Sequence, residues 1–377
     1  MNIGVIGYGS RISHVMNELQ KQHPEAKLSA IVDVRQNAIR ENQEARGNGG
    51  VHIYDTPEEM LSAEELDGIM IGTRCSLHTD MALKVLPSGI PLFLEKPVST
   101  TMDDLLRLKA GYEASNTQVV VSFPLRVTTI VQFIKEIVDS GKIGTIEHVQ
   151  AVNNVPYGNV YYQNWYRDEA ETGGLFLQKA THDFDYIQHV LGMEPNVISA
   201  MKSKQIFKGT KPAGLKCVDC DENRTCLESP YVSTNPHLSK SWQHCCFAED
   251  TGNEDSGSAL IQYESGMHVS YSQNFFARRG AGARGARFLG YKGTIEFDFM
   301  KSEVKVFMHH TPRVETYEFQ AGDDHFGGDS VLARNFGDIV KGNASSISPL
   351  EGGLLSALLC LKANESAATH TFREIRF

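Results

Sequence analysis

The sequence predicts an α/β domain with a doubly wound parallel sheet, followed by an α+β domain built on a large, mainly antiparallel open sheet. Three observations lead to this prediction. The chain of 377 residues is too long for one ordinary core. Apolar segments alternate with helical patterns up to residue 122, and strand-like segments dominate afterwards. We therefore predict two domains, residues 1–122 and residues 123–377.

The N-terminal domain begins with a strand, a glycine turn and a helix. The apolar stretch Ile3 to Ile6 leads into Gly7-Tyr8-Gly9-Ser10-Arg11-Ile12, where a helical pattern starts. Two glycines permit a tight turn and the close approach of a pyrophosphate, which the N–H groups of the helix N-terminus stabilise. A third glycine is usual at the position of Ile12, so the turn alone is weak evidence. The expected cofactor contacts here are Gly7, Gly9, Ser10, Arg11 and Ile12.

The second strand ends on a carboxylate. Leu28 to Val32 is followed by Asp33, which can accept the ribose hydroxyls of NAD and would repel the 2′-phosphate of NADP. Arg35 lies two residues further on, and its positive charge keeps NADP as an alternative cofactor. The predicted cofactor is therefore NAD or NADP, and Asp33 favours NAD.

The alternation of strands and helices continues through the N-terminal domain. We expect helices at 36–46, 78–86 and 102–114, a short helix after Pro57, and strands at 68–72, 90–94 and 118–121. Thr73 follows the strand at 68–72, and His78 begins the next helix. Both are predicted to line the cofactor site, although His78 could equally face solvent.

The buried strand at 90–94 runs directly into Glu95-Lys96-Pro97. Ligands of open parallel sheets bind outside the carboxyl ends of the strands, so Glu95 and Lys96 are candidates to contact a ligand. A solvated ion pair at a turn is the alternative explanation. Pro97 is a candidate for a cis peptide bond that fixes this turn.

The C-terminal domain is predicted to contain one large sheet with helices on one face. Its strand-like segments are 146–152, 196–201, 258–263, 268–275, 286–289, 294–297, 304–308 and 314–319. A second copy of the chain is the usual cover for the other face of such a sheet. We expect a homodimer or homotetramer.

One helical stretch, Gly173 to Gly192, carries several polar groups. Lys179, His182 and Asp183 are spaced i, i+3 and i+4, and Gln178 precedes His182 by one turn. These side chains share one region of the helix surface. They form either a site or a set of solvated pairs.

The chain resembles the Gfo/Idh/MocA family of sugar and polyol oxidoreductases over essentially its full length. The matching elements are the Gly7/Gly9 turn with Asp33, Glu95-Lys96-Pro97, Gly141-Lys142-Ile143-Gly144, His182-Asp183-Phe184-Asp185 before Leu191-Gly192, and His325-Phe326-Gly327-Gly328-Asp329. The resemblance implies an NAD(P)-binding Rossmann domain, a substrate-binding and oligomerisation domain, and a site between them. It also implies roles for Lys96 and His182. The family commonly has an aspartate where this chain has Gln178.

These likenesses imply the oxidation of a sugar, a cyclic polyol or a sugar derivative. We expect His182 to be the general base/acid, Lys96 to polarise the substrate oxygen and Lys179 to assist. The expected substrate contacts are Arg126, Trp165, Arg167, Asp183 and His325. The alternatives are an NAD-dependent glycosidase that uses transient oxidation and a non-catalytic NAD-binding regulator.

A cysteine-bearing insertion lies near residues 217–246. Cys217 and Cys220 form a C-x2-C pair, and Cys226 and Cys245 follow within a span that structural zinc sites use. The rest of the spacing is irregular, so bare thiols are an equal alternative to a candidate structural zinc site.

Composition limits the partners and the compartment. The formal net charge of -10 argues against a surface for nucleic acid or for an anionic membrane. No stretch reaches the roughly 20 apolar residues of a membrane span. We expect a cytoplasmic protein.

Overall fold

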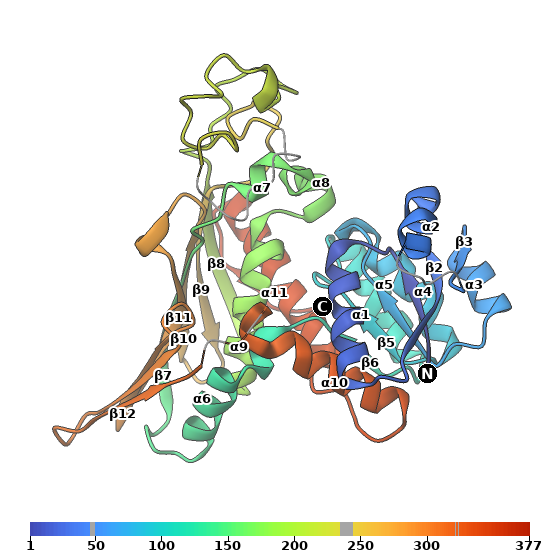
Figure 1. Ribbon diagram of the computed structural model, residues 1–377. Helices are drawn as coiled ribbons and strands as arrows, with labels where there is room; N and C mark the ends of the chain where they lie inside the picture. The colour runs from blue at the N-terminus through green and yellow to red at the C-terminus, as the bar shows by residue number, and fades with distance from the viewer. Residues whose placement is uncertain (46–49, 234–243, 321, 323) are drawn as a thin grey trace. The chain divides into compact units, whose positions relative to one another are not determined.

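The computed structural model of the protein describes residues 1–45, 50–233, 244–320, 322 and 324–377 (Figure 1). These residues form two compact units. The first comprises Met1–Val131, Ala321–Leu358 and Phe377, and the second comprises Gln132–Gln320 and Leu359–Arg376. The division differs from the predicted boundary after residue 122, because the chain returns to the first unit after residue 320.

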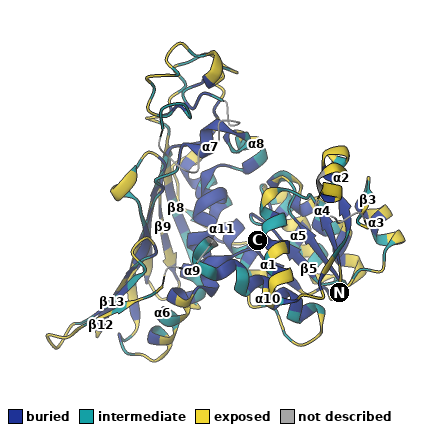
Figure 2. Ribbon diagram, viewed as in Figure 1, coloured by how far each residue is buried: buried dark blue, intermediate teal, exposed yellow. Residues whose placement is uncertain are grey.

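The first unit contains a parallel sheet of six strands in the order β3-β2-β1-β4-β5-β6. Its strands are β1 (Asn2–Ile6), β2 (Lys27–Val32), β3 (His52–Tyr54), β4 (Gly68–Ile71), β5 (Leu92–Leu94) and β6 (Val119–Val121). The last three strands are buried at every position, as expected for parallel strands that helices cover on both faces (Figure 2). The strand order reverses between β1 and β4, which confirms the doubly wound arrangement.

Helices and short 3-10 turns connect these strands. The helices are α1 (Ser10–Gln22), α2 (Gln36–Ala45), α3 (Pro57–Ala63), α4 (His78–Val85), α5 (Met102–Glu113) and α10 (Gly328–Val340), and α11 (Leu350–Thr369) starts in this unit. The 3-10 turns are η1 (Cys75–Leu77), η2 (Leu86–Ser88), η3 (Pro124–Val127) and η8 (Asp324–Gly327).

Helix α10 explains why the chain returns to the first unit. It packs beside α1, and Leu332 and Phe336 join the same buried cluster as Ile12, Val15 and Phe93. The rings of Phe336 and Phe93 meet edge to face, with their centroids 5.8 Å apart. A helix that is distant in sequence therefore completes the core of the dinucleotide-sized unit.

The second unit contains a sheet of nine strands in the order β14-β13-β12-β11-β7-β10-β9-β8-β15. Its strands are β7 (Ile146–Asn154), β8 (Pro195–Ser203), β9 (Ser256–Tyr263), β10 (His268–Asn274), β11 (Ala283–Gly290), β12 (Gly293–Asp298), β13 (Glu303–Met308), β14 (Val314–Glu318) and β15 (Arg373–Glu374). Strands β7 and β10 are parallel, and the other neighbouring strands described here are antiparallel. The predicted, mainly antiparallel sheet is confirmed.

Helices cover one face of this sheet. The helices of this unit are α6 (Thr129–Asp139), α7 (Val160–Gln163), α8 (Glu169–Thr172), α9 (Thr181–Leu191) and the second half of α11. Its short turns are η4 (Trp165–Arg167), η5 (Phe176–Ala180), η6 (Cys217–Asp219) and η7 (Arg279–Ala281). Phe184 of α9 packs against Tyr271 of β10, and Ser366 of α11 accepts a hydrogen bond from the backbone of Ala200 in β8.

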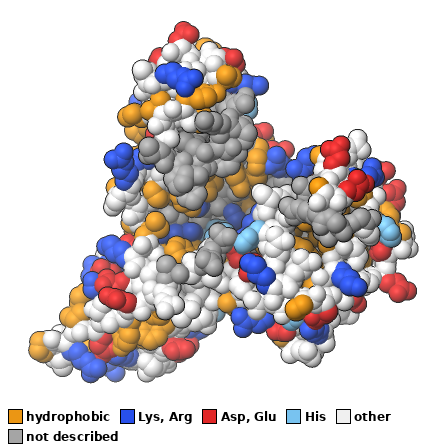
Figure 3. Space-filling model, viewed as in Figure 1, with side chains coloured by type: hydrophobic (Ala, Val, Ile, Leu, Met, Phe, Trp, Pro, Cys, Tyr) orange, Lys and Arg blue, Asp and Glu red, His pale blue; other side chains and the backbone are white. Residues whose placement is uncertain are grey.

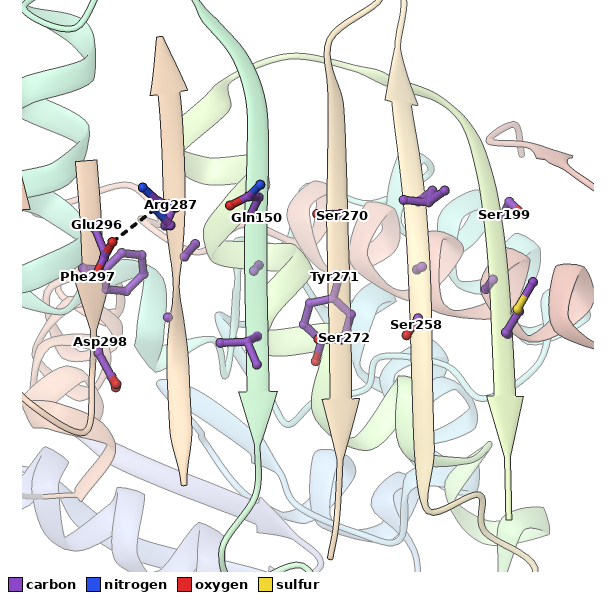
Figure 4. A pocket seen from close by; sticks show the side chains of 18 of the residues that line it. Gln150, Ser199, Ser258, Ser270, Tyr271, Ser272, Arg287, Glu296, Phe297 and Asp298 are labelled. Carbon is purple, nitrogen blue, oxygen red and sulfur yellow. Dashed lines mark ion pairs between the residues drawn. The ribbon is translucent and has the colours of Figure 1, made fainter. Parts of the chain in front are cut away.

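The outer face of the same sheet carries a shallow hollow of about 730 Å³ (Figure 4). Small side chains such as Ser258 and Ser270 line it, and Arg287 forms an ion pair with Glu296 at one side. Met201 and Leu260 on its lining are 74% and 52% exposed. The alternation of buried and exposed residues along β9 follows from a sheet with one covered face.

Charged side chains of both signs are interspersed over the face of the molecule shown in Figure 3. None of the helices that the structure describes is both long and apolar enough to cross a membrane.

Candidate functional site

The glycine turn after β1 forms a cradle at the start of α1. Gly7 has a φ of +81°, and a Cβ at this position would lie 2.7 Å from the backbone of Thr73. Gly9 is the N-cap of α1, and a Cβ there would first meet the carbonyl oxygen of Gly72, at 4.0 Å. The turn therefore needs glycine at residue 7 and leaves room beside residue 9 for a ligand at the helix N-terminus. Ser10 is exposed in the first turn of the helix.

Ile12 occupies the place of the third glycine, and it is fully buried. A Cβ at Gly72, directly after β4, would lie only 2.7 Å from the Cβ of Ile12. The close approach of helix and strand that normally requires the third glycine is here achieved through Gly72. The side chain of Ile12 belongs to the core, so the predicted cofactor contact at this position would be made by its backbone. Gly72 is the site residue that the pattern missed.

Asp33 lies at the end of β2 and stays ionised. Its carboxylate accepts the N–H of Tyr8 at 2.9 Å and two hydrogen bonds from the guanidinium of Arg35, at 2.9 and 3.1 Å. Burial alone would raise the pKa of Asp33, but the bonds from Arg35 and Tyr8 hold it below its ordinary value. The carboxylate therefore lies beside the glycine turn, with the guanidinium of Arg35 held against it.

Arg11 is engaged within the first unit. Its Nε donates to Glu95 at 2.9 Å, and its two terminal nitrogens donate to the two oxygens of Asp329, each at 2.6 Å. One of these nitrogens also donates to Ser122. Burial alone would raise the pKa of Asp329, but the bonds from Arg11 and His325 hold it far below its ordinary value. Arg11 therefore ties α1 to the end of β5 and to α10, in addition to any contact with a cofactor.

Lys96 lies on a supported turn at the carboxyl end of β5. The Lys96–Pro97 peptide bond is cis, as predicted. Lys96 is half-buried between buried neighbours, and Glu95 is 6% exposed. His78 is buried under this turn, with Nδ1 2.7 Å from the carbonyl oxygen of Pro97, and burial lowers its pKa. His78 therefore supports the lysine turn, and its side chain presents almost no surface to a cofactor.

The remaining predicted residues of the first unit lie at three places. Thr73 is half-buried after β4, and its hydroxyl donates to the carbonyl of Arg74. Arg126 is buried in η3, where a Cβ at Gly352 would lie 2.5 Å from its guanidinium. His325 contacts Asp329 through Nδ1 at 2.9 Å.

In the second unit, the predicted long helix contains a π-helical turn, η5, before α9 begins at Thr181. Lys179 in this turn is 6% exposed, and its Nζ donates to the hydroxyl of Tyr157 at 2.6 Å. His182 is in the first turn of α9 and is 5% exposed. Gln178 is 2% exposed, and its amide donates to the carbonyl of Thr172. Sequence spacing did not identify Tyr157, which lies 22 residues before its partner.

Asp183 is fully buried and holds a network together. One of its oxygens accepts Nε of Arg284 at 2.8 Å, and the other accepts from Asn153 at 2.7 Å and from Tyr271 at 2.9 Å. Asp183 has no exposed surface for the substrate contact that the sequence predicts, and its carboxylate holds Arg284, Asn153 and Tyr271 in place.

Arg167 and Trp165 lie in η4, next to the cysteine-bearing insertion. Arg167 is 7% exposed, and its guanidinium donates to both carboxylate oxygens of Asp250 and to Thr251. These bonds attach the segment that follows the insertion to η4. The guanidinium of Arg167 is thus engaged within the second unit, whereas the sequence predicts a contact with the substrate. Trp165 stacks on Tyr166, with the ring centroids 4.0 Å apart.

Glu254 is a second buried carboxylate that the sequence did not single out. It accepts the N–H groups of Leu175 and Phe176, at 3.0 and 3.2 Å, where the π-helical turn begins. Burial raises its pKa above the ordinary value.

The four cysteines of the predicted metal site are free thiols. Cys217 and Cys245 are buried, and Cys220 and Cys226 are half-buried. Burial raises the pKa of Cys217 to about 12, and the neighbouring thiols add to this effect. Within the described ranges, no group of three or more His, Cys, Asp or Glu side chains is arranged to hold a metal ion. The charges of Cys220, Cys226 and Cys245 all reach Cys217, and zinc at these thiols stays a prediction.

The fold and the glycine turn define a class of proteins in which a dinucleotide-binding Rossmann unit is joined to an open-sheet unit. Comparison with known proteins makes this assignment specific. Residues 1–123 match the oxidoreductase family with an NAD-binding Rossmann fold, and residues 131–296 match the GFO/IDH/MocA C-terminal domain. The chain belongs to the Gfo/Idh/MocA family.

Individual relatives include two inositol dehydrogenases. Myo-inositol 2-dehydrogenase of Thermotoga maritima is 28% identical over 222 residues, which cover 57% of this chain and 62% of the relative. The NAD-dependent scyllo-inositol 2-dehydrogenase of Bacillus subtilis is 26% identical over 207 residues, which cover 53% and 55%. The chain thus spans less than two thirds of the length of these curated relatives.

Among solved structures, levoglucosan dehydrogenase in complex with NADH and levoglucosan has a TM-score of 0.79. The alignment covers 100% of both chains at 17% identity. At this identity the likeness establishes the common fold.

Proposed function

We propose that this protein is an NAD(P)-dependent oxidoreductase that transfers a hydride between a nicotinamide cofactor and a sugar, cyclic polyol or sugar derivative. The observation that carries the proposal is the position of Lys96. It follows β5 directly, at the edge of the parallel sheet where ligands of this fold bind, and it shares the unit with the glycine turn. The names of the relatives, two of them inositol dehydrogenases, support the substrate class.

The residues of the first unit fit a dinucleotide. The room beside Gly9 and the N-terminus of α1 suit a pyrophosphate, and the ionised Asp33 suits the ribose hydroxyls of NAD. When bound, the nicotinamide supplies the hydride acceptor. We propose NAD as the preferred cofactor, because Asp33 would repel the 2′-phosphate of NADP.

The side chains of this protein would orient the substrate and move its proton. Lys96 is proposed to polarise the reacting oxygen. A residue of the second unit is proposed to accept the hydroxyl proton, a role that the sequence assigns to His182 with Lys179 assisting. Gln178 is neutral, so in this chain no charge at that position stabilises an imidazolium.

The test is NADH formation across a panel of sugars and inositols, measured for the wild type and for Lys96→Met. We expect the substitution to lower turnover by at least about 100-fold and to leave the Kd for NADH nearly unchanged. The same assay with NADP measures the cofactor preference.

Lys84→Met is the matched control. Lys84 lies in the same unit and forms an exposed ion pair with Glu58, so its loss should leave turnover as it is. A wild-type chain that reduces NAD with none of these compounds contradicts the proposed function. A Lys96→Met variant with full turnover contradicts the role of the lysine.

We also propose a cytoplasmic homodimer or homotetramer that associates through the outer face of the second unit's sheet. The exposed Met201 and Leu260, which line the hollow together with small residues, support this face. Sedimentation of the wild type measures the assembly. Zinc in the cysteine-bearing insertion stays a prediction, which elemental analysis of protein purified without chelator tests.

A further inference from the structure

Tyr157 and Lys179 form a hydrogen-bonded pair in the second unit. The Nζ of Lys179 donates to the Tyr157 hydroxyl at 2.6 Å and lies 4.7 Å from the centroid of its ring. Lys179 is 6% exposed, whereas Tyr157, just after β7, is only half-buried. Lys179 therefore donates to the Tyr157 hydroxyl from the more deeply buried side of the pair.

The charges around this pair are unequal. Lys179 and Arg284 of β11 each place a positive charge near the phenol, and Asp183 of α9 places a negative charge there. Both oxygens of Asp183 already accept hydrogen bonds, one from Arg284 and the other from Asn153 and Tyr271. Two cations and one carboxylate therefore act on the Tyr157 oxygen, and a negative charge on this oxygen would balance the second cation.

The acidity of the phenol agrees with this geometry. Burial alone would raise the pKa of Tyr157, but the charges of Lys179 and Arg284 and the bond from Lys179 lower it below its ordinary value, against the opposing effect of Asp183. Tyr161 of α7 belongs to the same aromatic cluster, and burial raises its pKa well above the usual range. The pKa values of these two neighbouring tyrosines are therefore shifted in opposite directions.

We propose that the oxygen of Tyr157, held by Lys179, accepts the substrate's hydroxyl proton during oxidation, a role that sequence alone assigned to His182. The inference rests on the proposed function. In this step the O–H bond of the substrate breaks and an O–H bond forms on the phenolate. The C–H bond at the same carbon breaks, its electron pair leaves as hydride for the oxidised nicotinamide, and C=O forms. The carbinol is oxidised and the nicotinamide is reduced.

The structure favours Tyr157 over His182 because the charge of Lys179 is applied to the phenol through a short hydrogen bond. The sequence pattern instead places Lys179 one helical turn before His182. A positive neighbour stabilises the phenolate and so lowers the pKa of the phenol. A larger fraction of the side chain is then in the form that can accept a proton.

The experiment compares Tyr157→Phe, Tyr161→Phe and His182→Asn on the full chain. Turnover is measured with NAD and the best substrate of the panel, over a range of pH, and the Kd for NADH is measured separately. We expect Tyr157→Phe to lower kcat by about 100- to 10,000-fold with an unchanged Kd for NADH. Tyr161→Phe should keep the wild-type pH profile, and His182→Asn should lower kcat less than Tyr157→Phe does.

A second pair of variants tests the role of Lys179. In the wild type, kcat should rise with pH as Tyr157 ionises and then level off, with an inflection below the ordinary tyrosine pKa of about 10. Lys179→Met should shift this inflection to higher pH, because burial remains and the cation is gone. Lys179→Arg keeps the charge and should restore the low inflection.

Tyrosinate absorbance provides a readout without turnover. The difference between the ultraviolet titrations of the wild type and Tyr157→Phe, both free of cofactor, reports the ionisation of Tyr157. An inflection at or above the ordinary value overturns the inference, and so does a Tyr157→Phe variant that keeps its kcat and pH profile. Failure of the wild type to form NADH is a separate result, which contradicts the proposed function.

Discussion

The two units each bury a small cluster of charges, and the clusters have opposite excess charge. In the first unit, the Arg11 cluster places two carboxylates, Glu95 and Asp329, on one guanidinium. In the second unit, the Arg284 cluster places one carboxylate, Asp183, among the cations Arg284 and Lys179.

This difference separates a structural role from a chemical one. The Arg11 cluster joins α1, the end of β5 and α10, and its carboxylates are satisfied by strong charge-assisted bonds. In the Arg284 cluster, the second cation is Lys179, which would stabilise an additional anion. Its Nζ lies 2.6 Å from the hydroxyl of Tyr157. An excess of cations over carboxylates beside an ionisable neutral group therefore marks a candidate reaction site better than the number of buried charges does.

The strongest test of the comparison is Asp183→Asn. The substitution leaves the buried Arg284 without its counter-charge and points an amide group at the donors Asn153 and Tyr271. We expect the free energy of unfolding to fall by about 3–5 kcal/mol, measured by urea denaturation. Tyr271→Phe is the control, since it removes one neutral donor and should cost about 2 kcal/mol. Equal losses in the two variants would mean that the charge of Asp183 is not what stabilises the cluster.

A smaller loss is expected for Asp329→Asn. Glu95 still neutralises Arg11 in this variant, so we expect a cost of about 2–3 kcal/mol at neutral pH. Since the pKa of Asp329 is depressed in the folded chain, its contribution is present above the unfolded value of about 4 and is lost as pH falls through the folded pKa. The wild type and the variant should therefore converge in acid.

Denaturation of both proteins over a pH series measures this convergence. Asp80→Asn serves as the control, because the ion pair of Asp80 with Arg107 is exposed and should contribute less than about 1 kcal/mol. If the difference in the free energy of unfolding between the wild type and Asp329→Asn does not change with pH, Asp329 is not an ionised partner of Arg11.

The smallest effect is expected for Glu254→Gln, and its pH dependence has the opposite sign. Backbone N–H groups, rather than a guanidinium, hold this carboxylate, and burial raises its pKa. The wild type should lose stability as pH rises from the unfolded value of about 4.3 through the raised folded value. Glutamine keeps an acceptor for Leu175 and Phe176 and should remove this slope. Parallel pH profiles for the two proteins would contradict the assignment.

Local patterns were sufficient for the features that lie within a few residues of one another. The strand, glycine turn and helix at the N-terminus, Asp33 after the second strand, and the cis bond before Pro97 were all predicted from neighbouring residues. The open sheet was also predicted, because its strands alternate in burial with a period of two.

The remaining features depend on contacts between distant parts of the chain. The hydrogen bond from Lys179 to Tyr157 joins residues 22 positions apart, and no spacing in the sequence marks this pair. The packing of α10 against α1 depends on complementary apolar faces rather than on any motif. Burial decides whether Asp183 and His78 contact a ligand or support another residue, and a sequence pattern does not report burial of an individual side chain.

The π-helical turn at Phe176–Ala180 sets the angular phase of the helix that follows it. Such a turn holds one more residue than an α-helical turn, and each residue of an α-helix advances by about 100° around the axis. Removing a single residue here would rotate the segments on either side of the turn relative to each other by about that angle. Lys179 and His182 would then no longer face the directions they now face, although every side chain of the site would still be present.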